Sequence, residues 1–140
     1  MTEPCSFCHI AAGRADASIV AHDALTVAFV DARQFHHGHV LVIPRQHVAD
    51  IRAADDATVA AVAVTVSRVA RAVDAVFPSD GLSIWHSAGA GANQEVPHFH
   101  VHVHPRRLGD DLLQIYPRSP ATPTRATLDE IAAAIRDGIE

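Results

Sequence analysis

The feature that most constrains this chain is the segment 97–105, in which histidine alternates with apolar residues. A period of two is typical of a β-strand, because successive side chains point to opposite faces. We therefore predict that Phe99, Val101 and Val103 point into a core. The other face would carry a row of imidazoles, spaced about 6.7 Å apart along the strand: His98, His100, His102 and His104.

Three interpretations of this row are open. The first is a half-exposed strand that carries histidine at its polar positions by chance. The second is a three-histidine catalytic zinc site, but the outer residues of His-x-His-x-His lie about 13 Å apart. To bind one zinc ion at a Zn–N distance of roughly 2.1 Å, both outer rings would have to lie along the strand, in the space that the middle ring fills. The geometry therefore disfavours this site.

The third interpretation is that the middle imidazole attacks phosphorus. Such a ring must be neutral, with one nitrogen attacking while the other carries the proton and is oriented by an acceptor, for which a nearby backbone carbonyl could serve. Negative charge on the phosphate would be met by a neighbouring imidazolium and by backbone amides of the loop 87–93. That loop contains Gly89 and Gly91, which permit close approach.

Length and charge limit the class of protein. The chain has 140 residues without a compositional break, which fits a single domain, 1–140. A net charge of −5 and the absence of a basic run argue against a nucleic-acid partner. Neither a signal peptide nor a transmembrane run is expected, which predicts a cytoplasmic protein without a membrane partner. The two cysteines, Cys5 and Cys8, are then metal ligands or redox thiols rather than a disulfide.

Local patterns predict the remaining elements. We expect a short helix over 6–12, a hairpin of strands 19–20 and 25–30 about Asp23, and strands at 39–43 and 81–86. An irregular arm should follow Arg106 and continue to Pro123, and a short terminal helix should begin at a Thr127/Glu130 capping box. Between 55 and 77, apolar spacing predicts a long helix with one buried face: Val59, Val62, Val66, Val69, Val73 and Val76.

The segment 94–103, followed by Pro105 and Arg106, closely resembles the signature of the histidine triad family. Three upstream segments, 5–10, 29–31 and 39–47, fall in the order and spacing of the branch that includes nucleoside phosphoramidases. The resemblance covers about 5–106 and leaves 107–140 as a C-terminal arm. It implies an α+β fold with an antiparallel sheet, a long helix and short terminal helices, assembled as a homodimer.

The resemblance also implies a reaction. Family members hydrolyse purine nucleotide derivatives in two steps through a nucleotidyl-histidine, and the substrates include phosphoramidates, anhydrides and dinucleoside polyphosphates. His100 matches the nucleophile, His102 would bind and help protonate the phosphate, and His98 completes the triad. Asp31 would hold the ribose hydroxyls. The base would lie between three residues for which core packing is the alternative role: Phe7, Ile10 and Phe29.

Several predicted substrate contacts depart from the family pattern. Ser87 stands where many members have Asn, and Asn93 stands where Gly is usual. Glu95, beside Gln94, replaces a Ser that can donate to the leaving group. An ionised Glu95 cannot donate a hydrogen bond, so a leaving-group proton would come from His102 or water. These departures affect substrate preference.

The resemblance further implies a zinc site and no organic cofactor. The matching residues, Cys5, Cys8, His47 and His98, form a ligand set that suits closed tetrahedral structural zinc, with free thiols as the alternative. Two other functions stay open, since the fold alone does not establish turnover. One is a non-catalytic nucleotide-binding regulatory protein, and the other is a metal-dependent hydrolase.

Overall fold

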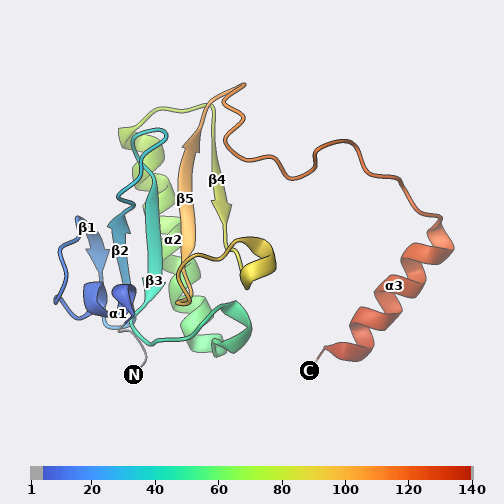
Figure 1. Ribbon diagram of the computed structural model, residues 1–140, viewed down its shortest axis with the longest axis horizontal. Coiled ribbons are helices and arrows are strands. Elements are labelled where there is room, and N and C mark those ends of the chain that lie inside the picture. Colours follow the sequence, from blue (N-terminus) through green and yellow to red (C-terminus); the bar gives the residue numbers. More distant parts are fainter. Residues whose placement is uncertain (1–4, 140) are drawn as a thin grey trace. The chain divides into compact units, whose positions relative to one another are not determined.

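The computed structural model describes residues 5–139, which form an α+β fold built on a five-stranded antiparallel sheet (Figure 1). The strand order is β1-β2-β3-β5-β4. The chain divides into two compact units, one ending at Asp110 and one beginning at Asp111. The strands are β1 Ile19–His22, β2 Thr26–Val30, β3 Val40–Pro44, β4 Gly81–Trp85 and β5 Val101–Arg106, and the helices are α1 Ser6–Ala11, α2 Asp56–Val76 and α3 Arg125–Gly138.

The predicted β1–β2 hairpin is confirmed, and Asp23 forms its turn. One carboxylate oxygen of Asp23 accepts hydrogen bonds from the backbone N–H groups of Leu25 and Thr26, at 2.8 and 2.7 Å. This is the local bonding that makes aspartate favourable in turns. Both hydrogen bonds lower the pKa of Asp23, and the bond from Leu25 has the larger effect.

The predicted long helix is also confirmed. Asp55 is the N-cap, and its side chain accepts from the Thr58 N–H. The buried face includes Val62, Val66, Val69 and Val73. The prediction was wrong for Val76, which is 66% exposed. As the last residue of α2, it lines a surface pocket instead of packing on the sheet.

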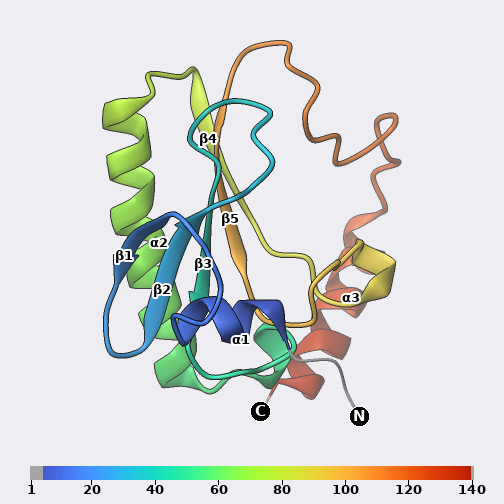
Figure 2. The same cartoon turned by 60° about the vertical axis from the view of Figure 1, so that its left-hand side comes forward.

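The two faces of the sheet carry different helices (Figure 2). α2 packs on one face, where Ala28, Val42 and Val103 join its valines in one core. A second core on the other face holds Phe7 of α1 with Phe29 and Ile43, among others. Leu41 belongs to that second core and pairs with His102 across β3 and β5. Since directly paired residues share a face, His102 points to the α1 side.

The histidine segment is only partly strand. Phe99 and Val103 are buried as predicted, and Val101 packs against the α2 core. However, β5 begins at Val101, so residues 97–100 lie outside the ladder. Two of their backbone hydrogen bonds go to loop residues instead of a neighbouring strand. The His98 N–H donates to the Val96 carbonyl at 2.8 Å, and the Phe99 N–H donates to the Val48 carbonyl at 2.7 Å. The predicted strand was therefore too long at its start.

The second unit contains most of the predicted irregular segment, from Asp111 on, and α3. The predicted cap was wrong: Thr124 is the N-cap, and its side chain accepts from the Thr127 N–H, which already lies within the helix. The Thr124 backbone is extended, with ψ of 158°, so the helix starts after it and runs longer than expected. No helix within residues 5–139 combines the length and apolar character that crossing a bilayer requires.

Candidate active site and metal centre

His100 lies one residue before β5 and is 5% exposed. Its Nδ1 is 2.7 Å from the backbone carbonyl of His98. A carbonyl can only accept, so Nδ1 carries the proton and Nε2 of the neutral ring keeps its lone pair. This is the tautomer that a nucleophilic imidazole needs, and the acceptor is a backbone carbonyl as expected.

His86, just after β4, fixes the backbone of His100. The Ile51 N–H donates to His86 Nε2 at 3.2 Å. Nε2 is therefore the acceptor nitrogen, and Nδ1 donates to the His100 carbonyl at 3.0 Å. Burial lowers the pKa of His86, which favours this neutral form. No local signal in the sequence indicates this role, because it depends on a contact between two distant loops.

Behind the nucleophile, three side chains form a connected set. His102 Nδ1 lies 2.9 Å from His39 Nε2, and His39 Nδ1 lies 3.6 Å from an Asp31 carboxylate oxygen. The carboxylate favours a proton on His39 Nδ1, so His39 Nε2 accepts from His102 Nδ1–H. Trp85 stacks on the His102 ring at 4.3 Å, almost parallel. His102 Nε2 is then the unprotonated nitrogen of the resting ring.

The imidazoles of this set are held neutral. Burial, then the neighbouring His100 and His39, lowers the pKa of His102 to about 3. Burial also lowers the pKa of His39, against the opposing effect of Asp31. Burial lowers the pKa of His104 as well, and its Nδ1 donates to the Pro105 carbonyl at 2.7 Å. The expected neighbouring imidazolium is therefore not the resting state of His102.

These pKa values predict a pH dependence of stability. Unfolding returns His39, His102 and His104 to an ordinary pKa near 6.5, so below about pH 6.5 the unfolded chain binds more protons than the folded chain. The stabilisation is complete above that pH and is lost as the pH falls toward the folded pKa of His102, about 3. We expect calorimetry to show a Tm that drops between about pH 7.5 and about pH 5. A constant Tm would contradict the burial of neutral rings.

The four predicted metal ligands come together beside α1. One ligand atom from each of Cys5, Cys8, His47 and His98 lies within 4.8 Å of the others. His98 Nδ1 is 3.4 Å from Cys5 Sγ, 3.5 Å from Cys8 Sγ and 3.2 Å from His47 Nδ1. Tetrahedral zinc with these ligands has edges of about 3.4–3.8 Å. The residues present therefore fit a closed zinc site.

His98 connects this cluster to the nucleophile. Its Nε2 donates to the Pro44 carbonyl at 2.9 Å, which leaves Nδ1 free as a ligand. Its own carbonyl accepts from His100 Nδ1. A metal ion on His98 Nδ1 would therefore restrict the position of the His98 carbonyl, which sets the tautomer of His100.

The predicted ribose and base residues lie near the triad. Asp31 is buried, and one oxygen accepts from the Arg33 N–H at 2.9 Å. Phe7 and Phe29 pack edge to face at 5.4 Å, and the Phe7 ring lies 5.2 Å from that of His100. Ile10 is half-buried against the same core. Both phenylalanines therefore have a packing role, and contact with a base stays a prediction.

The loop before the triad positions the other predicted contacts. Asn93 has a left-handed backbone, with φ of 63°, a conformation that asparagine tolerates and glycine favours. The Gln94 side chain accepts from the Gly89 N–H at 2.8 Å and donates to the Ala49 carbonyl. The Gly89 N–H is therefore already hydrogen-bonded and is not free to bind a phosphate. Glu95 is paired with Arg33 at 2.9 Å. Ser87 is half-buried at the start of this loop.

Comparisons with known proteins identify relatives of this chain. An uncharacterized HIT-like protein of Mycobacterium tuberculosis is 38% identical over 109 residues, covering 78% of this chain and 76% of that protein. The Arabidopsis thaliana protein named adenylylsulfatase HINT3 is 30% identical over 108 residues, covering 77% of this chain and 55% of that protein.

Solved structures extend the likeness to the fold. A crystal structure of a HIT family protein from Bacillus anthracis has a TM-score of 0.92 at 32% identity and covers 100% of both chains. A Zn-bound histidine triad family protein from Mycobacterium smegmatis has a TM-score of 0.72 at 37% identity, covering 93% of this chain and 96% of that one. The family model described as HIT domain matches residues 12–109. The chain therefore belongs to the HIT domain family.

Proposed function

We propose that the protein is a nucleotide hydrolase or transferase that works through a nucleotide covalently bound to His100. The observation that carries this proposal is the hydrogen bond from His100 Nδ1 to the His98 carbonyl at 2.7 Å. It directs the lone pair to Nε2, the nitrogen that can attack phosphorus. With 5% of His100 exposed, neighbouring side chains must move to admit a substrate.

The proposed reaction has two displacements. The His100 Nε2 lone pair forms a bond to the phosphorus of a nucleoside monophosphate derivative, and the bond to the leaving group breaks, with its electrons leaving on that group. Water then attacks phosphorus, loses a proton, and displaces His100 as the nucleoside monophosphate is released. His102 Nε2 is unprotonated at rest, and it can accept the proton of that water once the negative charge of the bound phosphate stabilises the protonated ring.

The same arrangement favours substrates whose leaving group departs as a stable anion. In the resting tautomer His102 has no Nε2 proton to give, and Glu95 is paired with Arg33 and can only accept. An amine leaving group needs a proton, whereas sulfate or phosphate does not. The name of the Arabidopsis relative, adenylylsulfatase HINT3, is consistent with this chemistry.

A substrate panel tests the proposed function. We expect kcat/KM for adenosine 5′-phosphosulfate to exceed that for adenosine 5′-phosphoramidate by about tenfold or more at neutral pH, since supplied protons typically contribute a hundredfold or more. Release of AMP is followed by chromatography. A preference for the amidate would show that an acid reaches the leaving group, and no turnover of either compound would remove the proposal.

His39 is predicted to be a positioning residue. Replacing His39 with Asn removes the acceptor for His102 Nδ1, so the His102 ring loses its fixed tautomer. We expect kcat to fall about a hundredfold while nucleotide affinity changes little. Stopped assays with parallel AMP titrations measure both quantities, and the pH profile of kcat should change shape. An unchanged profile with lower affinity alone would assign His39 to binding.

We also propose that the protein forms a homodimer and binds zinc at the four-residue cluster. β4 is an edge strand, and its Ile84 is 51% exposed, so a second copy could pair with this edge. The Zn-bound relative and the distances among the ligand atoms support zinc. Light scattering and metal analysis of the purified protein address these two points.

A further inference from the structure

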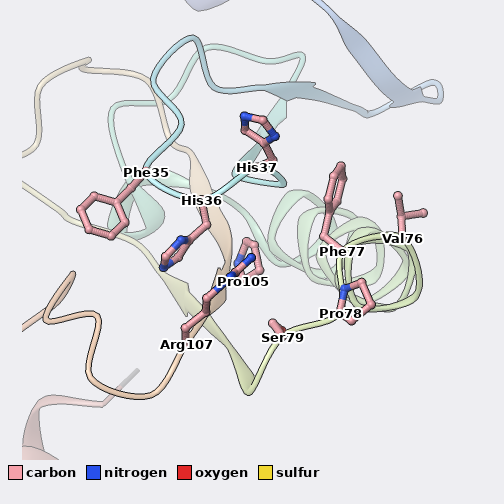
Figure 3. Close-up of a pocket in the computed structure, with 9 residues that line it drawn as sticks. All are labelled: Phe35, His36, His37, Val76, Phe77, Pro78, Ser79, Pro105 and Arg107. Carbon is pink, nitrogen blue, oxygen red and sulfur yellow. The ribbon is translucent and has the colours of Figure 1, made fainter.

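A surface pocket of about 410 Å³ lies within the unit that ends at Asp110. It forms where α2 and β5 end, with the loop 35–37 as its third wall. Figure 3 shows Phe35 and His36 on one side and Val76, Phe77 and Pro78 on the other. Neither the triad nor the metal cluster contributes to its lining. Its size falls within the range of about 300–1,000 Å³ that is usual for small-molecule sites.

The loop wall is preformed. The Gln34 side chain donates to the carbonyls of Asp31 and His39 and accepts from the N–H groups of Gly38 and His39, at 2.7–3.2 Å. Gly38 has φ of +118°, and a Cβ there would lie 3.1 Å from atoms of Phe77 and of Pro105. The loop is therefore seated directly on the pocket floor, and its shape needs no ligand to form.

The polar side chains of the pocket favour an anion. The lining contains two imidazoles and the Arg107 guanidinium but no carboxylate. His36 contacts Asp110, whose nearly buried carboxylate is already paired with Arg106. Within residues 5–139 the Arg107 side chain makes no salt bridge. A guanidinium at the rim of a partly apolar pocket is a strong site for a carboxylate or phosphate.

Three large apolar side chains of the lining are accessible. Phe35 is 61%, Val76 66% and Phe77 41% exposed. Apolar side chains gathered around a hollow favour a ligand with a flat apolar body, because stacking on aromatic rings buries area on both partners. We propose that this pocket binds a small aromatic anion, with its ring against the apolar side chains of the lining and its carboxylate or phosphate on Arg107.

The test uses the full-length, isotope-labelled protein and 2-naphthoate as the probe. We expect saturable amide shifts in Phe35, His36, His37, Phe77 and Ser79. The uncharged analogue 2-naphthalenemethanol should bind at least about tenfold more weakly, because the charge-assisted hydrogen bond is lost. Acetate, which lacks the ring, should give no saturable shift.

Three variants separate the contributions. Arg107→Gln should raise the Kd about tenfold, and Phe35→Ala should raise it severalfold; both residues are exposed, so the fold should persist. Arg71→Gln, an exposed α2 arginine bonded to Ser67, should leave the Kd unchanged. The proposal is overturned if no shift saturates, if the alcohol binds equally well, or if Arg107→Gln has no effect.

Discussion

Replacement of His100 by asparagine is expected to lower kcat for AMP release by about ten-thousand-fold or more, the scale seen when a catalytic nucleophile is removed. Asparagine approximates the shape of the ring and can still donate to the His98 carbonyl, but it offers no lone pair of comparable nucleophilicity. Nucleotide affinity, measured by calorimetry, should persist because the other contacts remain.

His22→Asn is the matched control. His22 is exposed at the end of β1, so the same substitution there should leave both kcat and affinity unchanged. Turnover that survives in His100→Asn would exclude the covalent mechanism. If neither the variant nor the wild-type protein turns over any nucleotide derivative while both bind AMP, the non-catalytic regulatory alternative is favoured.

Disruption of the metal cluster is expected to have the largest effect on stability. His47→Asn removes one of four ligand atoms, so the purified variant should lose its zinc, whereas the wild type carries about one equivalent. Without the metal, α1 is no longer linked to the loop before β5, so the free energy of unfolding should fall by roughly 3 kcal/mol and the Tm by about 10 °C. Metal analysis and calorimetry measure these effects.

His9→Asn is the control for this site, because His9 is adjacent to Cys8 but lies outside the cluster. It should retain zinc and the wild-type Tm. Brief chelation of the wild type should lower Tm before it lowers turnover. Immediate loss of turnover at unchanged Tm would instead support the metal-dependent hydrolase, and full occupancy in His47→Asn would refute the assigned ligands.

The sequence predicted the elements whose signals are local. The Asp23 turn, the valine face of α2 and the alternation of Phe99 and Val103 each depend on neighbouring residues, and each was confirmed. Errors arose at element ends. Val76 follows the apolar period but lies at the end of α2, and Thr127 fits a capping box inside a helix that already starts at Arg125.

The site was harder to predict, because its contacts join distant segments. Cys5, Cys8, His47 and His98 were named through the family resemblance, and the fold brings them together. His39 and His86 were missed as site residues. His39 meets His102 only through the pairing of β3 with β5, and His86 meets His100 across two loops, so neither contact leaves a periodic signal. The base contacts, the homodimer and the cytoplasmic location stay predictions.

The most direct test of the covalent mechanism is to quench turnover in mild base, digest the protein and weigh the peptide that contains His100. The mechanism predicts a mass increase equal to one bound nucleoside monophosphate, located on the His100 ring and absent from His100→Asn. Steady turnover without any adduct, or an adduct on another residue, would contradict the nucleophilic role of His100.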